Sequence, residues 1–204
     1  MDHRARLPLD PGVLNPVSTV GTRPITADEV VEVAGRIVDA QGADALTMRR
    51  LADELGVAVT SIYWHVGNRD ELVDALVDRL LADVGTLRAR GATPRERIAS
   101  LARALRKKLL ERPQLVALAH ERARTPAMFQ PVQDAIGREL AAMGLPGEET
   151  ALALRALQLH VITSVLLVRS IDRYGATEHV DAVEVFEFTL VAMLDALEAR
   201  ARVT

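Results

Sequence analysis

Apolar residues recur at intervals of three and four positions through most of this chain, which is the period of an amphipathic α-helix. Gly, Pro, Thr and Asn stand where the pattern stops and restarts, as is typical of helix ends. The pattern predicts nine helices, at about residues 26–41, 47–55, 57–66, 69–84, 93–112, 114–122, 125–143, 147–174 and 178–201. No segment gives a β-strand signal. The sequence therefore predicts an all-α fold.

The helical pattern breaks at residues 85–92, and this break divides the chain into two predicted domains. Residues 24–84 are expected to form a small three-helix domain followed by a linking helix. The linking helix carries two neighbouring apolar stripes, so it can pack on the small domain and on a second domain at once. Residues 93–204 form that larger helical domain. Residues 1–23 contain prolines and show no period, which indicates a flexible arm.

The short helix predicted at residues 57–66 exposes an unusual set of side chains. They lie outside the expected core and are Val59, Thr60, Ser61, Tyr63, Trp64 and His65. Hydroxyls, a phenol, an indole N–H and an imidazole can all reach phosphate oxygens or base edges. With Gly56 at the turn, the two helices have the spacing of a helix-turn-helix, whose second helix enters the major groove of DNA. Alternatively, Tyr63 and Trp64 are half-buried packing residues with polar tips.

The run ALTMRRLADELGVAVTSIYWHVGNRDELVDAL resembles the DNA-binding segment of the TetR family of transcriptional regulators. The YWHV run followed by Asn68 and Arg69 is similar to the tetracycline repressors within that family. The close resemblance covers roughly a quarter of the chain. It implies an N-terminal helix-turn-helix domain and a C-terminal helical domain for ligand binding and dimerisation.

The resemblance also implies roles for individual residues. Arg49 would place its guanidinium on a base edge, and guanine suits it. Thr47 and Thr60 would give hydroxyls to phosphates, and Tyr63, Trp64 and His65 match the aromatic run that contacts the DNA backbone. Arg69 takes the place of a phosphate-binding lysine. Val59 departs from the polar residue of the tetracycline repressors and can only touch a thymine methyl, so we expect a different operator sequence.

The charge balance gives no broad basic surface. Lysine and arginine total 25 against 28 acidic residues, for a net charge of −3. DNA contacts must therefore come from local arginines, hydroxyls and helix N-termini, and nonspecific affinity should be modest. In the arm, Arg4, Arg6 and Arg23 either lie along a DNA groove or belong to an unengaged tail.

Several function classes are not expected. The chain has no cysteine, which excludes disulfides and thiolate metal sites. It contains no GxSxG, HExxH or phosphate-binding glycine loop, so we expect neither an enzyme nor a cofactor or metal. It shows no signal-like N-terminus and no uninterrupted apolar run of membrane-spanning length. These features predict a cytoplasmic protein without a membrane partner.

Polar residues interrupt the most apolar predicted helix, residues 147–174. They are Gln158, His160, Thr163 and Ser164. Buried polar groups need partners. These residues either satisfy one another, or line a contact between subunits, or join His120 around an apolar-walled pocket for an unidentified small-molecule effector.

The resemblance implies a magnesium-binding role for a histidine placed like His120. Where the tetracycline repressors have a second metal-side carboxylate, this chain has Leu166, Leu167 and Val168. Two extra residues also separate His120 from the Thr-Pro start of the following helix. We therefore do not expect a tetracycline–magnesium complex as effector.

The last two predicted helices indicate a homodimer. Leu152–Val168 is apolar nearly all round, and the last helix carries a heptad-like seam of Val183, Phe186, Leu190, Met193 and Leu197. Two such helices would pair with their copies in a four-helix bundle. The sequence thus predicts a homodimeric repressor that binds a palindromic double-stranded DNA operator and is released by a ligand. The alternatives are a DNA-binding dimer without inducer, or an all-α ligand-binding protein that has lost DNA binding.

Overall fold

The computed structural model describes residues 24–174 and 181–202 of the chain. Over these residues it contains helices and no strand, so the predicted all-α fold is confirmed. The helices are α1 (Ala27–Gln41), the 3₁₀ turn η1 (Ala43–Ala45), α2 (Met48–Leu55), α3 (Val59–Val66), α4 (Arg69–Gly85), α5 (Pro94–Leu110), α6 (Pro113–Glu121), α7 (Thr125–Ala142), α8 (Gly147–Tyr174) and α9 (Ala182–Ala201). The predicted arm with Arg4, Arg6 and Arg23, and a helix start near residue 178, lie outside the described residues.

Side-chain caps fix where several of these helices begin. Thr26 caps α1, Asn68 caps α4 and Thr93 caps α5, each in a reciprocal capping box with a glutamate three residues later. Such a box satisfies N–H groups that the helix itself leaves unpaired. The helix start predicted at Thr26 is therefore set by local hydrogen bonds, and the same motif sets the starts of α4 and α5.

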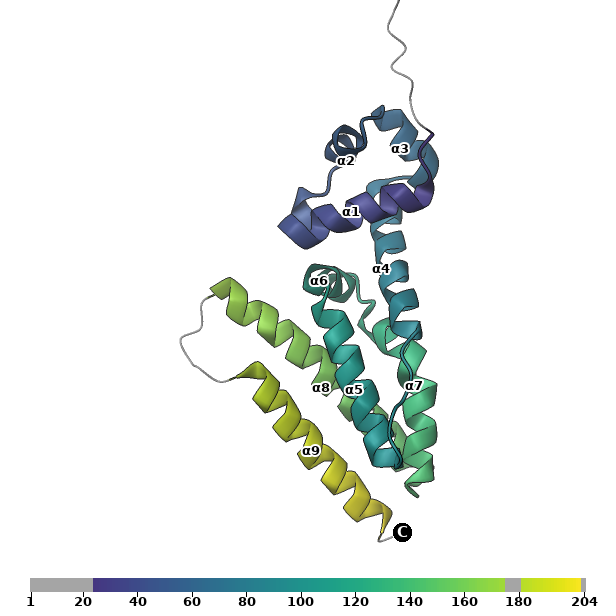
Figure 1. Cartoon of the computed structure of the whole chain (residues 1–204), viewed down its shortest axis with the longest axis vertical. Helices are drawn as coiled ribbons and strands as arrows, with labels where there is room; N and C mark the ends of the chain where they lie inside the picture. The colour runs from purple at the N-terminus through teal and green to yellow at the C-terminus, as the bar shows by residue number, and fades with distance from the viewer. Residues whose placement is uncertain (1–23, 175–180, 203–204) are drawn as a thin grey trace, which may run out of the picture.

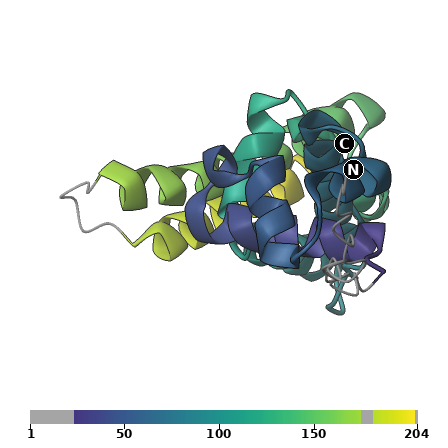
Figure 2. The same cartoon turned by 90° about the horizontal axis from the view of Figure 1, so that it is seen from above.

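The helices are arranged as a head and a longer body (Figure 1). α1, α2 and α3 form the head, and α4 runs from it down into the body beside α7. α5 and α6 stand in the middle of the body, α7 lies along the side opposite α9, and the long helices α8 and α9 lie side by side (Figure 1). Seen from above, the far ends of α8 and α9 project beyond the rest of the molecule (Figure 2).

One continuous apolar cluster joins head and body. Ile62 of α3 and Leu51 of α2 are fully buried in the head, and Leu76 and Leu80 of α4 carry the cluster on to Leu101 of α5. α1 and α4 both contact α6. The division into residues 24–84 and 93–204 therefore stays a prediction, because packing runs across it.

Arginines from the body pair with aspartates of the head and of α4. Arg112 places Nη2 2.7 Å from Asp39 of α1. It crosses α1 at Gly35, where an added Cβ would lie 2.6 Å from the same nitrogen. Arg122 pairs with Asp70 and Asp74, and Arg124 reaches Asp78 at 2.6 Å. These pairs attach one side of α4 to the turn between α6 and α7.

The heptad-like seam of α9 mostly faces its own subunit. Phe186 and Leu190 are buried against the body, as is Leu194. The seam was expected to meet a second subunit, and for Phe186 and Leu190 this expectation is wrong, whereas Val183 is exposed and Met193 and Leu197 are half-buried. Intrasubunit packing on α5 and α8 takes up the Phe186 and Leu190 side chains. A different set of apolar residues on α8 and α9 is exposed: Leu152, Leu159, Leu167, Val183, Val185, Phe188 and Val191.

α8 is long and apolar enough to cross a membrane when judged by length and composition alone. Its segment Gly147–Val168 has a mean hydropathy of 1.8, and only 28% of the most apolar window is buried. Core and interface helices of soluble proteins pass the same test, and here Arg155 and His160 interrupt the run. The low burial reflects the exposed apolar face shared with α9.

Candidate nucleic-acid interface and effector residues

The turn between α2 and α3 sets the direction of α3. Thr47 caps α2, and its Oγ1 accepts a hydrogen bond from the Arg50 N–H at 3.1 Å. Gly56 ends α2 with φ 67° and ψ 33°, a left-handed conformation that glycine adopts without strain. No side chain caps α3, because Ala58 stands at its N-cap. The N–H groups of Val59 and Thr60 at the start of α3 are therefore available to solvent or a phosphate, whereas the Ser61 N–H donates to the Ala58 carbonyl.

α3 buries one residue and exposes most of its other side chains to solvent. Ile62 is fully buried and anchors the helix on the head. Trp64 is 89% exposed and Tyr63 50% exposed, and Thr60 and His65 are also exposed. Val59 and Ser61 are half-buried, and Val59 packs against the core. Trp64 is therefore not a packing residue, and the outward face combines an indole N–H, a phenol, an imidazole and a hydroxyl.

The two adjacent arginines of α2 have different surroundings. Arg50 donates from Nη1 to Gln41 at 2.7 Å and lies 3.9 Å from Glu54. Arg49 is exposed, and no ion pair or side-chain hydrogen bond is recorded for it within the described residues. Arg49 is thus the arginine of this pair whose guanidinium is available to DNA.

Arg69 does not stand free at the surface. Its Nε donates to the carbonyl of Leu46 at 3.0 Å, and its Nη2 donates to the carbonyl of Ala43 at 2.9 Å. The guanidinium is half-buried and joins the first residue of α4 to the segment before Thr47. These two hydrogen bonds give Arg69 a positioning role, and the phosphate contact expected of it stays a prediction. Sequence spacing carried no signal for this contact, because the partners are backbone carbonyls more than twenty positions away.

The five expected effector residues do not converge. His120 is exposed and its Nδ1 lies 2.8 Å from Thr125 Oγ1. Gln158 accepts from Arg155, Ser164 donates to the carbonyl of Val161 at 2.7 Å, and Thr163 is exposed. Within the part of the chain that the structure describes, no group of three or more His, Asp or Glu residues could hold a metal ion.

His160 belongs to a stacked cluster between α5, α8 and α9. Its ring lies parallel to Phe186 at 4.6 Å between centroids, and its Nε2 is 3.1 Å from the Phe186 carbonyl. The guanidinium of Arg106 packs over the same Phe186 ring, 4.8 Å from the ring centroid. Burial lowers the pKa of His160. The neutral imidazole is therefore the form that this cluster favours.

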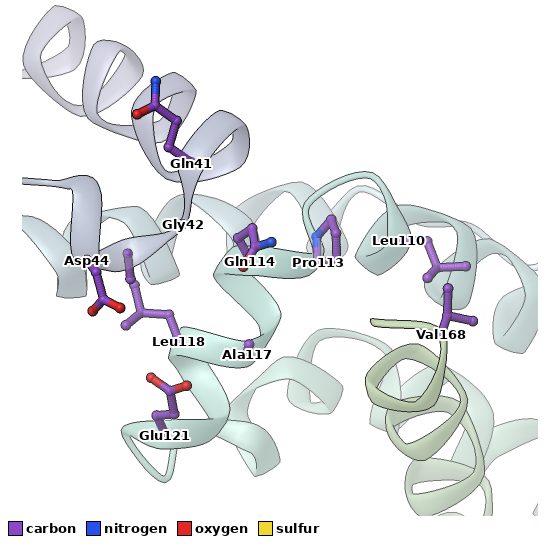
Figure 3. A pocket seen from close by; sticks show the side chains of 11 residues that line it. Gln41, Gly42, Asp44, Leu110, Pro113, Gln114, Ala117, Leu118, Glu121 and Val168 are labelled. Carbon is purple, nitrogen blue, oxygen red and sulfur yellow. The ribbon is translucent and has the colours of Figure 1, made fainter. Parts of the chain in front are cut away.

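A cavity of about 530 Å³ lies elsewhere, between the end of α1, η1 and α6. None of the five expected effector residues lines it (Figure 3). Its walls come from segments about 70 residues apart in the sequence, so periodicity within one helix gave no sign of it.

Comparison with known proteins identifies the class. A family profile described as "Bacterial regulatory proteins, tetR family" matches residues 30–76, which extend from α1 to α4. Residues 30–76 therefore carry the DNA-binding domain of the TetR family. The resemblance stated from the sequence is thereby confirmed.

Individual relatives extend the likeness beyond the head. An HTH-type transcriptional regulator of Saccharopolyspora erythraea is 32% identical over 145 residues, which are 71% of this chain and 61% of that protein. The class E tetracycline repressor of Escherichia coli is 26% identical over 160 residues, covering 78% of this chain and 75% of the repressor. This chain thus spans less than two thirds of the length of the Saccharopolyspora regulator.

Solved structures are similar over nearly their whole length. BioQ of Mycobacterium smegmatis superposes with a TM-score of 0.69 at 28% identity, covering 87% of this chain and 99% of BioQ. ActR of Streptomyces coelicolor, without ligand, gives 0.67 at 29% identity, covering 88% of this chain and 97% of ActR. The likeness therefore includes the body as well as the head.

Proposed function

We propose that this protein is a DNA-binding transcriptional repressor whose two subunits each place α3 in the major groove of a palindromic operator. The observation that carries the proposal is the outward face of α3, where Trp64 and Tyr63 stand exposed on a helix anchored by Ile62. A water-exposed indole and phenol can donate hydrogen bonds to phosphate oxygens without carrying charge. Arg49, at the start of α2, supplies a cation that can read a guanine edge.

A second copy of the chain completes the operator contact. One short recognition helix reads few base pairs, whereas two held about 34–36 Å apart read both halves of a palindrome. The exposed apolar residues of α8 and α9, among them Phe188 and Leu159, support pairing of these helices across a two-fold axis. Such a dimer would work in the cytoplasm, where its operator lies.

A small-molecule effector is part of the proposal. ActR, similar in structure, has been solved in complex with actinorhodin. An effector acts here by binding one arrangement of the subunits more tightly than the other, because a ligand with equal affinity for both shifts nothing. A protein built this way needs no catalytic residue.

Binding to the DNA upstream of the protein's own gene, measured by fluorescence anisotropy of labelled DNA, tests this function. Tyr63→Phe removes the phenol O–H and keeps the ring, and Trp64→Phe removes the indole N–H and leaves a smaller aromatic ring. Each should weaken binding about tenfold, since a hydrogen bond to a charged group contributes about 1.5–3 kcal/mol. Gln130→Ala, an exposed change on α7, is the control and should leave the affinity unchanged. Wild-type affinity in both aromatic variants would place α3 away from DNA.

A further inference from the structure

The cavity between head and body has the size of a small-molecule site. Its volume of about 530 Å³ lies within the range of about 300–1,000 Å³ typical of ligand pockets. Gln41, Gly42, Ala43 and Asp44 form the wall on the head side, and α6 forms the wall on the body side. Leu110 at the end of α5 and Val168 of α8 close one end of it (Figure 3).

Two carboxylates line the other end. Asp44 comes from η1 and Glu121 from the last turn of α6, and Figure 3 places them on either side of Leu118. Neither forms an ion pair with any residue that the structure describes. The other aspartates at this junction form ion pairs with arginines. These aspartates are Asp39, Asp70, Asp74 and Asp78. Both side chains are exposed, so the mouth of the cavity carries two unpaired negative charges in a region where other acids are paired.

No lining residue supplies a compensating cation. Gln41 accepts a hydrogen bond from Arg50, but that arginine also lies near Glu54. The remaining wall is apolar or uncharged and includes Leu118, Ala117 and Pro113. A cleft lined by charges of one sign raises the local concentration of the opposite sign. Its ligand should thus combine a positive charge with an apolar body.

The geometry points to a binding site for a small organic cation between η1 and α6. An ammonium group lies between Asp44 and Glu121, and a hydrocarbon or aromatic body extends along Leu118 toward Leu110 and Val168. The amide of Gln114 offers a further hydrogen bond from α6. This site is distinct from the five effector residues expected from the sequence, of which His120 is next to Glu121 in the chain but not in the wall.

The cavity wall is connected directly to the DNA-binding helices. Ala43 lines the cavity, and its carbonyl accepts the hydrogen bond from Arg69 of α4. Thr47, the cap of α2, follows η1 by two residues. An occupant therefore touches the segment that positions the helix-turn-helix, and its binding changes operator affinity. This consequence rests on the proposed function, whereas the binding site itself does not.

A matched pair of probes tests the site by calorimetry on the whole chain without DNA. The probes are 4-phenylbutylamine, a cation at neutral pH, and the uncharged 4-phenylbutanol. The amine should bind saturably, one per chain, and about tenfold or more tightly than the alcohol, with a preference that weakens in high salt. Because no DNA is present, this result is independent of whether the protein binds an operator.

Substitutions locate the binding. Asp44→Asn with Glu121→Gln should remove the preference for the amine and leave binding of the alcohol unchanged. Asp134→Asn with Glu148→Gln removes the same charge from exposed positions outside the cavity and should keep wild-type affinity. Gln114→Phe fills the cavity from a half-buried position and should block both probes. Thermal melting of each variant confirms folding.

Each calorimetric result either supports or overturns the cation site. Loss of the preference for the amine over the alcohol in the Asp44/Glu121 variant alone establishes the cation site. Equal binding of amine and alcohol, absence of saturable binding, or wild-type affinity in that variant overturns it. If the site holds, adding the amine to the operator complex measures the coupling, which must be reciprocal between the two ligands.

Discussion

Two surfaces of this protein expose large side chains, and they differ in what those side chains can bond. On α3, the exposed rings of Trp64 and Tyr63 carry an N–H and an O–H. On α8 and α9, Phe188 is 76% exposed and Leu152 70% exposed, and both are pure hydrocarbon. The first surface is small and belongs to one short helix, whereas the second extends over two long ones.

The difference indicates what each surface meets. A polar-tipped ring remains hydrogen-bonded in water and can exchange water for a phosphate oxygen. A leucine or phenylalanine gains only from contact with another apolar surface, and a continuous exposed patch marks an interface. Large exposed residues thus predict DNA in one place and a second subunit in the other, and the distinction lies in the polar atoms of the side chains.

The largest effect should come from placing charge on the α8–α9 surface. Leu159→Asp with Phe188→Asp introduces two carboxylates where a second subunit is expected, and burying unpaired charges is prohibitive. The variant should be monomeric by light scattering and should lose operator binding completely, although both positions are remote from α3. Both side chains are exposed in the single chain, so its helical content should be retained.

A charge-matched control sharpens this test. Gln130→Asp with Ala141→Asp adds the same charge to exposed positions of α7. It should remain dimeric and bind the operator like the unmodified protein. If the α8–α9 variant remains a dimer, the exposed apolar residues of α8 and α9 do not form the contact between subunits.

A smaller effect should separate two arginines of the DNA-binding region. Arg69→Ala removes two hydrogen bonds to carbonyls and should cost about 2 kcal/mol of folding free energy, lowering Tm by about 4–8 °C. Arg49→Ala removes an exposed side chain and should leave Tm unchanged. It should weaken operator binding and reduce the salt slope by about one. A normal Tm for Arg69→Ala would show that its contacts do not hold η1 in solution.

The smallest effect should come from protonation of His160, in the stacked cluster between α5, α8 and α9. Burial lowers the pKa of His160 below its ordinary value of 6.5, while Arg106 and Glu187 face it from α5 and α9. The unfolded chain then binds the proton more readily, so stability is complete above pH 6.5 and declines as the pH falls. His160→Gln should flatten the fall in Tm between about pH 6.5 and 5. An unchanged slope would contradict this assignment.

Glu187 also contributes stability that is lost on acidification, but in a lower pH range than His160. The hydrogen bonds from Arg103 lower the pKa of Glu187 below its ordinary 4.5. Stability from this pair is therefore complete above pH 4.5 and is lost as the carboxylate becomes protonated. The two windows are separate, so the His160 variant should leave the decline below pH 4.5 intact.

Helix positions could be predicted from the sequence because their signals are local. The Thr-x-x-Glu box at Thr26 and the proline after Thr93 fix helix starts through neighbours a few residues away. Gly56 gave the turn of the helix-turn-helix for the same reason. The exposed character of Trp64 followed from periodicity once Ile62 was assigned to the core.

Partners distant in the sequence could not be predicted. Arg69 and Arg122 find acceptors 23 and 52 positions away, and nothing in their own neighbourhood distinguishes them from exposed arginines. Phe186 and Leu190 have the spacing of an intersubunit seam, but α5 and α8 of the same chain cover them. Periodicity shows which residues share a helix face and not which surface covers that face.

The exposed indole of α3 has a practical consequence for measurement. Trp64 is the only tryptophan in the chain, so excitation beyond the absorption of tyrosine selects a single fluorophore. Its emission in the free protein should be that of an indole in water, given its exposure. Contact with DNA would change its intensity and wavelength. The unlabelled protein thus carries its own optical reporter on the helix that is proposed to enter the groove.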